Sequence, residues 1–115
     1  MRLCGISNCD TVRKARAWLA GNGIEIPFHD FRKSGVTREM LEEWTGKLGW
    51  EALVNRKGTT WRQLDEAGKA GVNSRESAIE LMLEKPSVIK RPVLEVEGRI
   101  LLGFDEREYT ETFKK

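Results

Sequence analysis

The chain contains 115 residues, 39% hydrophobic and 33% charged, which is typical of one globular domain. Its 20 Lys and Arg against 18 Asp and Glu give a net charge of +2, without the basic stripe that nucleic-acid-binding proteins carry. No apolar run approaches the ~20 residues of a membrane helix, and the chain does not open on a secretion signal. We therefore expect a cytoplasmic protein that binds neither nucleic acid nor membranes directly.

The first third of the chain is typical of a strand, a helix and a second strand. An apolar run, Leu3–Ile6, ends in turn residues and is followed by a helical pattern over Asp10–Asn22. Asp10 or Thr11 is the expected cap of this helix. Alternating apolar residues then indicate a strand over Ile26–Phe31. A βαβ unit of this length predicts a parallel pair of strands.

The middle of the chain, approximately residues 36–85, is predicted to be a helical insertion. Thr37 is a good N-cap for a helix ending at Gly49, and a capping-box pattern at Asn73–Glu76 opens another. Between them, Gly58–Gly71 favours a short helix. We expect the four tryptophans to pack in the core or between domains; they are Trp18, Trp44, Trp50 and Trp61.

The last third is typical of an antiparallel hairpin and a helix. Val93–Val96 and Ile100–Leu102 flank the turn Glu97-Gly98, and Asp105 caps the final helix. The element order predicts a single α/β domain over residues 1–115, in which one mixed sheet joins a βαβ half and a ββα half.

Cys9 is the first candidate for chemistry. It lies between a strand-ending turn and the first helix, where unpaired N–H groups and the helix dipole favour an anion. A thiol at such a position has its pKa lowered and becomes nucleophilic at neutral pH. The alternative is that Cys9 is simply a small residue closing a turn.

The chain lacks a second thiol at the spacing of a dithiol motif. Position 12 is Val, so C-x-x-C is absent, and Cys4 lies in the apolar strand, where cysteine behaves as a small hydrophobe. A Cys4–Cys9 disulfide would need geometry that sequence does not reveal. A mixed disulfide at Cys9 is therefore expected to be resolved by cytosolic glutathione, a co-substrate and not a bound cofactor.

Two cationic segments could assist this chemistry. Arg91 precedes Pro92, which interrupts a strand-like run, and this arginine could face an anion or the Cys9 thiolate. Arg56 and Lys57 lie in a glycine-containing loop that could bind an oxyanion or a glutathione carboxylate. His29 is the only histidine, and we expect it to be structural, with no metal site.

Several ordered motifs together resemble the arsenate-reductase-like (ArsC/Spx) family, and especially its YffB-type branch of glutathione-dependent thiol reductases. The resemblance runs over essentially the whole chain, and these motifs carry it: Gly5–Thr11, Lys14–Arg16, Phe28–Asp30, Leu48–Leu53, Gly58–Trp61, Ile89–Pro92 and Leu102–Phe104.

The resemblance implies a thioredoxin-like fold, with Cys9 as nucleophile, Pro92 as a cis-proline and Arg91 facing the anion beside the thiolate. We expect Asn8, Asp10, Thr11, Arg56, Lys57 and Pro92 to bind the substrate or glutathione. The expected function is a glutathione-dependent thiol oxidoreductase acting on a small thiol, disulfide or oxyanion.

Two alternatives remain from the sequence. One is an Spx-like module that binds a protein partner, RNA polymerase in that branch, without turnover. The other is a weak arsenate reductase: Asn55 stands where that loop carries an arginine, and Leu102-Gly103-Phe104 adds none. An arsenate oxyanion needs several positive donors.

Overall fold

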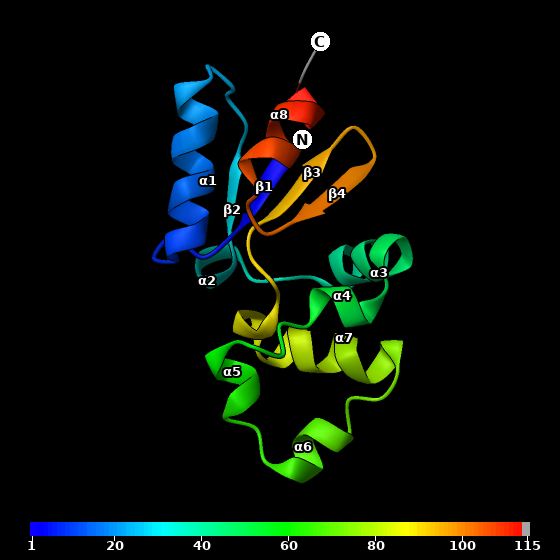
Figure 1. Cartoon of the computed structure of the whole chain (residues 1–115). Coiled ribbons are helices and arrows are strands. Elements are labelled where there is room, and N and C mark those ends of the chain that lie inside the picture. Colours follow the sequence, from blue (N-terminus) through cyan, green and yellow to red (C-terminus); the bar gives the residue numbers. More distant parts are fainter. Residues whose placement is uncertain (114–115) are drawn as a thin grey trace. The chain divides into compact units, whose positions relative to one another are not determined.

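The computed structural model describes residues 1–113 and divides into two compact units (Figure 1). The first comprises Met1–Arg32 with Arg91–Lys115, and the second comprises Lys33–Lys90. The helical segment expected at approximately 36–85 falls within the second unit. That the whole chain forms one domain with an insertion stays a prediction.

The first unit is built on a four-stranded sheet in the order β2-β1-β3-β4. Strand β1 pairs in parallel with β2, and β1–β3 and β3–β4 pair antiparallel, so the sheet is mixed as predicted. The elements of this unit are β1 (Arg2–Gly5), α1 (Asp10–Gly21), β2 (Phe28–Asp30), β3 (Val93–Val96), β4 (Arg99–Leu102) and α8 (Glu106–Phe113).

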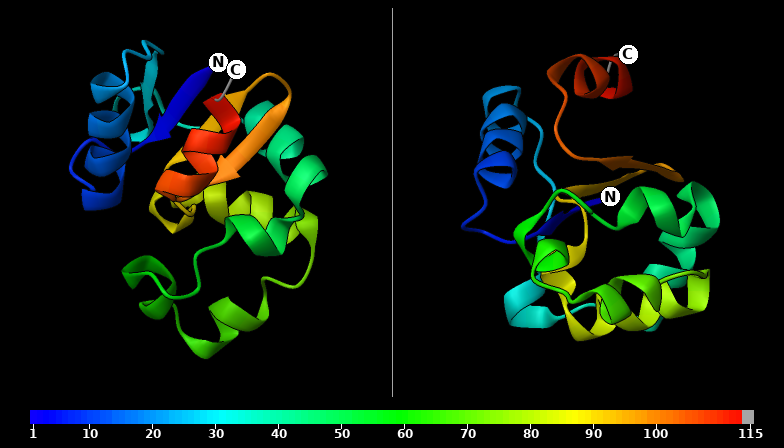
Figure 2. Two further views of the ribbon diagram at one scale, coloured as in Figure 1. Left: turned by 45° about the horizontal axis from the view of Figure 1, so that its top comes forward. Right: turned by 60° about the horizontal axis from the view of Figure 1, so that its bottom comes forward.

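Its core lies between one face of this sheet and the two helices α1 and α8. The strand register places Leu3 opposite Leu94 and Leu94 opposite Leu101, so one row of leucines crosses three strands. Leu19 from α1 and Tyr109 from α8 complete this buried cluster. Figure 2 shows both helices on the same side of the sheet. Burial of this apolar row is what holds α1, and with it Cys9, against β1.

The N-cap of helix α1 lies one residue before the first of the two expected caps. Cys9 itself is the N-cap, with extended backbone dihedrals, and Asp10 is the first helical residue, so the prediction of Asp10 or Thr11 as cap was wrong. The turn before it is closed by the Cys9 N–H, which donates to the Ile6 carbonyl at 3.2 Å. The apolar spacing confirms the buried face, since Val12, Ala15 and Leu19 are all buried.

The second strand is shorter than the expected Ile26–Phe31. Strand β2 covers only Phe28–Asp30, because Phe31 already begins the short helix α2 (Phe31–Ser34) and buries its ring there. Before the strand, the Pro27 carbonyl accepts from the Leu3 N–H at 2.9 Å. Proline carries no N–H of its own to extend the ladder.

The second unit is helical and is organised around two long helices. Its elements are α3 (Arg38–Leu48), α4 (Trp50–Leu53), α5 (Thr59–Arg62), α6 (Glu66–Ala70), α7 (Arg75–Glu84) and the 3-10 turn η1 (Pro86–Val88). Thr37 caps α3 as predicted. Helix α7 opens on a capping box as expected, but the box is formed by Ser74 and Ser77, one residue later than the predicted Asn73–Glu76 pattern. Residues 58–71 form two short helices instead of the one expected.

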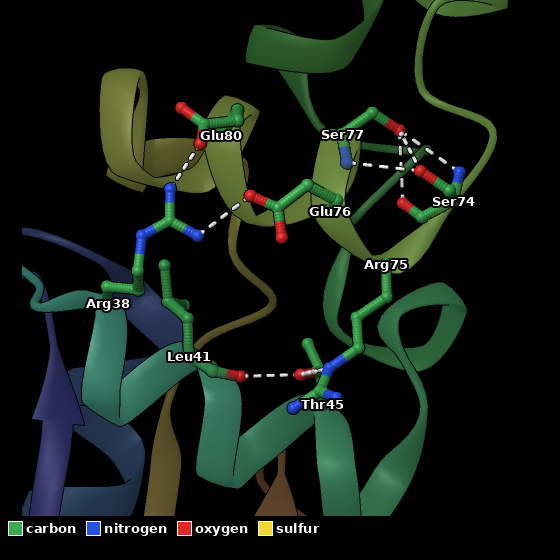
Figure 3. Close-up of polar contacts among 8 residues, drawn as sticks. All are labelled: Arg38, Leu41, Thr45, Ser74, Arg75, Glu76, Ser77 and Glu80. Atoms are coloured by element: carbon green, nitrogen blue, oxygen red, sulfur yellow. Dashed lines mark hydrogen bonds and ion pairs between the residues drawn. The ribbon is translucent and has the colours of Figure 1, made fainter.

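Polar contacts connect α3 to α7 along their length (Figure 3). Arg38 forms ion pairs with Glu76, at 3.0 Å, and with Glu80. Further along α3, the Arg75 Nε donates to the Thr45 Oγ1 at 2.9 Å. The Thr45 hydroxyl in turn donates to the Leu41 carbonyl at 2.7 Å, so this buried hydroxyl is fully used.

Only one of the four tryptophans is fully buried. Trp44 has no exposed surface and lies on the α3 face of the second unit, as expected. Trp18 is half-buried and packs edge-on against Tyr109 at a centroid distance of 5.6 Å. Trp50 and Trp61 are half-buried beside a charged loop and are not core residues, so for these two the alternative of packing between domains stays a prediction. Within residues 1–113, no helix is both long enough and apolar enough to cross a membrane.

Candidate active site

Cys9 lies at the beginning of α1, half-exposed at the tip of the turn that leaves β1. Its pKa is lowered from the ordinary value. Partial burial acts in the opposite direction, but interactions of the thiolate with the Val12 N–H, the Arg91 side chain and the Thr11 N–H outweigh it. These donors are the unpaired first-turn N–H groups of a helix together with one cation. The geometry therefore favours a thiolate at Cys9.

Arg91 and Pro92 belong to the same unit as Cys9, although 82 residues separate Cys9 from Arg91 in the sequence. Arg91 acts on the Cys9 thiolate both by a side-chain hydrogen bond and by its charge. The Arg91–Pro92 peptide bond is cis, and the Pro92 carbonyl accepts from the Gly103 N–H at 2.9 Å. The residue before β3 is thus held next to the beginning of α1.

Gly5 allows this close approach. An added Cβ at Gly5 would lie 2.8 Å from the Val12 Cγ2 and 3.8 Å from the Pro92 Cα. A β-carbon does not fit at 2.8 Å, so the last residue of β1 must be small for Val12 to stay buried. Sequence reasoning did not single out Gly5, because nothing in the sequence shows that three distant segments meet there.

The two neighbours of Cys9 are joined by a residue that the sequence reasoning also did not single out. Arg13 donates to the Asp10 Oδ1 at 2.5 Å and to the Asn8 carbonyl at 3.5 Å. Asp10 is highly exposed, so this pair is screened by solvent and is worth little for stability. The ion pair nevertheless places the positive charge of Arg13 beside Asp10, the carboxylate that directly follows Cys9 in the sequence.

Cys4 differs from Cys9 in every respect that matters for reactivity. It is fully buried in β1, and burial raises its pKa to about 12. Both cysteines are free thiols. Cys4 is consequently a poor nucleophile at neutral pH and an internal reference for Cys9.

The remaining predicted site residues are placed as follows. Arg56 and Lys57 are exposed in the second unit, between α4 and α5. Their predicted role in binding a substrate of Cys9 stays a prediction, as does that of Asn8 and Asp10. His29 pairs with Cys4 in the β1–β2 register. Among residues 1–113, no group of three or more His, Cys, Asp or Glu side chains is arranged to hold a metal ion.

The sequence matches the ArsC family over residues 4–112. The chain belongs to the ArsC family. Among solved structures, the YFFB (PA3664) protein is 49% identical and superposes with a TM-score of 0.92, covering 96% of each chain. An arsenate reductase (ArsC) related protein from Brucella melitensis is 46% identical, with a TM-score of 0.77 over 99% of this chain and 94% of that chain. These neighbours confirm the predicted ArsC-type, thioredoxin-like fold.

This ArsC-family chain also has relatives that are known from sequence. An uncharacterized protein of Haemophilus influenzae is 43% identical over 109 residues, which is 95% of each chain. The global transcriptional regulator Spx of Streptococcus agalactiae is 29% identical over 103 residues, covering 88% of this chain and 74% of the regulator. The proteins to which the chain is similar thus include one named as related to arsenate reductase and one named as a transcriptional regulator.

Proposed function

We propose that this ArsC-family protein is a glutathione-dependent thiol oxidoreductase with Cys9 as its single nucleophile. The observation that carries the proposal is the half-exposed Cys9 at the beginning of α1, with its pKa lowered by first-turn N–H groups and by Arg91. Such a thiolate attacks disulfide sulfur at neutral pH.

The reaction proceeds in two balanced exchanges. The Cys9 thiolate attacks the glutathionyl sulfur of a mixed disulfide; the new Cys9–glutathione bond forms, the old S–S bond breaks, and the substrate leaves as a thiolate. A second glutathione thiolate then attacks the glutathionyl sulfur, releasing oxidised glutathione and regenerating the Cys9 thiolate. Arg91 and the Val12 N–H stabilise the negative charge on Cys9 at the beginning and end of the cycle.

The thiol that resolves the Cys9–glutathione disulfide is expected to come from solution, because the chain has no suitable second cysteine. The sequence contains two, and Cys4 is buried with a raised pKa. Val12 occupies the position that carries the resolving cysteine in a C-x-x-C motif, and its side chain is buried. A thiol from solution is therefore required, and glutathione is the abundant cytosolic one.

Cys9→Ser tests this proposal. We expect it to abolish reduction of a glutathionylated substrate coupled to glutathione, because serine supplies no thiolate, while thermal unfolding stays within a few degrees of wild type. Cys4→Ala is the matched control and should keep most of the turnover. Undiminished turnover by Cys9→Ser would contradict the proposal.

An assay with arsenate in place of the disulfide distinguishes thiol–disulfide exchange from arsenate reduction, the activity in the name of the Brucella melitensis neighbour. Arg91 is the one cation that acts on the Cys9 thiolate within the first unit as the structure describes it. Because a single cation holds a multiply charged oxyanion weakly, we expect disulfide exchange to exceed arsenate reduction. If arsenate were turned over faster than the disulfide, arsenate would be the better candidate for the substrate.

A further inference from the structure

Two of the sequence motifs are not used by the chemistry of Cys9, and the first unit brings them together. Lys14–Arg16 lies on α1, and Phe28–Asp30 forms β2, the strand at one edge of the sheet. The guanidinium carbon of Arg16 lies 4.3 Å from the centroid of the Phe28 ring, within the range of cation–π attraction. This contact lies at the rim of a pocket that both residues line.

The pocket has a volume of about 420 Å³ and lies between α1 and the segment that connects α1 to β2. In Figure 1 this segment leaves the end of α1 and returns beside the helix to β2. Most of the lining is apolar and comes from Leu3, Leu19, Ala20 and Phe28, together with residues of the connecting segment. Leu3 and Leu19 belong to the buried cluster of the first unit, so the pocket reaches its core. Both the volume and the apolar lining are typical of sites that bind small molecules.

The wall of the pocket is held at both ends by backbone hydrogen bonds. At the start of the connecting segment, the Ile24 N–H donates to the Leu19 carbonyl at 2.9 Å. At its end, the Pro27 carbonyl accepts from the Leu3 N–H at 2.9 Å. The segment is thus bonded to α1 on one side and to β1 on the other. A ligand that enters this pocket does not have to order its wall first, which lowers the entropic cost of binding.

Two side chains of opposite charge line the pocket, Arg16 and Glu25. Within residues 1–113 neither forms an ion pair, and both are exposed. The contact with Phe28 uses the face of the Arg16 guanidinium, so its N–H groups, which lie in the plane, stay able to bind a carboxylate. A neutral apolar molecule would leave both charges unmatched, and an apolar acid would be repelled by Glu25. A zwitterion with an apolar group matches all three features.

We propose that this pocket binds a free α-amino acid with an apolar side chain. The ligand carboxylate accepts hydrogen bonds from Arg16, its ammonium group donates to Glu25, and its side chain lies against the apolar lining. Arg16 follows Cys9 by seven residues of the same chain, which is roughly 10 Å along a helix axis at ~1.5 Å per residue. The pocket is therefore a second site, and the inference does not depend on thiol chemistry at Cys9.

Chemical-shift titration of ¹⁵N-labelled protein with L-phenylalanine tests the proposal. We expect the shift changes to concentrate in α1 and in residues 24–28. The protein should bind L-phenylalanine about fivefold or more tightly than L-phenylalaninamide or N-acetyl-L-phenylalanine, because each of these lacks one of the two charges. Equal affinity for the three compounds would overturn the proposal, as would the absence of binding at millimolar L-phenylalanine.

Two variants assign the charges separately. Arg16→Gln should weaken binding of L-phenylalanine and remove its advantage over the amide, while the advantage over the N-acetyl compound remains. Glu25→Gln should have the reverse pattern. Arg107→Gln is the matched control, because it removes an exposed arginine of α8 that does not line the pocket. An equal loss for all three compounds in Arg16→Gln would contradict its predicted contact with the carboxylate.

A third variant tests the pocket itself. Ala20→Trp fills the space from the exposed side of α1 and should abolish binding, whereas Ala17→Trp adds the same ring to an exposed position of α1 outside the lining and should not. The ¹⁵N spectra show whether each variant is folded. Undiminished binding by Ala20→Trp would overturn the proposal. Cys9→Ser should bind L-phenylalanine as the wild-type protein does, so failure of the proposed thiol chemistry is recognised separately.

Discussion

At the scale of single residues, the chemistry depends on the difference between two thiols of one small chain. Cys4 is buried in a strand with a pKa of about 12, whereas Cys9 meets backbone N–H groups and Arg91, which lower its pKa. The neutral form is favoured in the first environment and the charged form in the second. Cys4 and Cys9 are only five positions apart, and their reactivity differs because one lies in a buried strand and the other at a helix N-terminus.

Arg91→Leu should raise the Cys9 pKa, because it removes both a hydrogen bond and a positive charge from the thiolate. The thiolate fraction near pH 7 then falls, and alkylation of Cys9 should slow severalfold. Above the pKa of both proteins, the variant should react at least as fast as wild type, since a more basic thiolate is a better nucleophile. Absorbance of the thiolate against pH gives the two pKa values directly. Identical curves would show that Arg91 does not act on Cys9.

The same lowered pKa has a consequence for stability. A group whose pKa is lower in the folded than in the unfolded chain stabilises the fold above its unfolded pKa, and this contribution is lost as the pH falls through the folded value. Ionised Cys9 therefore contributes to stability at alkaline and not at acidic pH. Because Cys9 is half-exposed, the contribution is small.

At the scale of elements, the site depends on the close approach of β1, α1 and the segment before β3. Gly5→Ala should destabilise the protein by about 1–3 kcal/mol, because its Cβ would overlap the Val12 Cγ2 and force the first turn of α1 to shift. The shift should also raise the Cys9 pKa, since the Val12 N–H is one of its donors.

Gly21→Ala is the control for this change. A Cβ at Gly21, near the end of α1, meets no atom within 4 Å in the described chain, so this variant should be neutral or more stable by up to ~1 kcal/mol. Thermal unfolding and the Cys9 titration of both variants check the prediction. A Gly5→Ala protein with unchanged stability and Cys9 pKa would contradict it.

Several elements could be predicted because their signals are local. The apolar spacing of Val12, Ala15 and Leu19 and the Thr37 cap each depend on a few adjacent residues. The capping box of α7 was predicted one residue too early. The end of β2 was missed because burial of the Phe31 ring in a helical turn is a tertiary effect. The contact of the Trp50 and Trp61 rings with Arg56 was missed for the same reason, because it depends on how a loop folds.

At the scale of the whole molecule, the two units divide the chain at Arg32–Lys33 and Lys90–Arg91. Cys9, Arg91 and Pro92 are within the first unit, so the beginning of the chain and its last quarter build the candidate site together. Cys9 could be singled out from its local context. Its interaction with Arg91 was one of two possibilities from the residues and was implied by the family resemblance, but local patterns alone do not establish it, because the sequence does not state which distant segment pairs with β1.

Membership in the ArsC family does not by itself show that Cys9 is reactive. The central claim is that Cys9 is a stabilised, nucleophilic thiolate. The most direct test is the rate of iodoacetamide alkylation of Cys9 against pH, followed by mass spectrometry, with Cys4 of the same molecules as reference. The account predicts that the Cys9 rate reaches its plateau well below the pH ~8.5 of a free thiol, while Cys4 stays unmodified throughout. A Cys9 that titrates like a free thiol, or reacts no faster than Cys4, would contradict it.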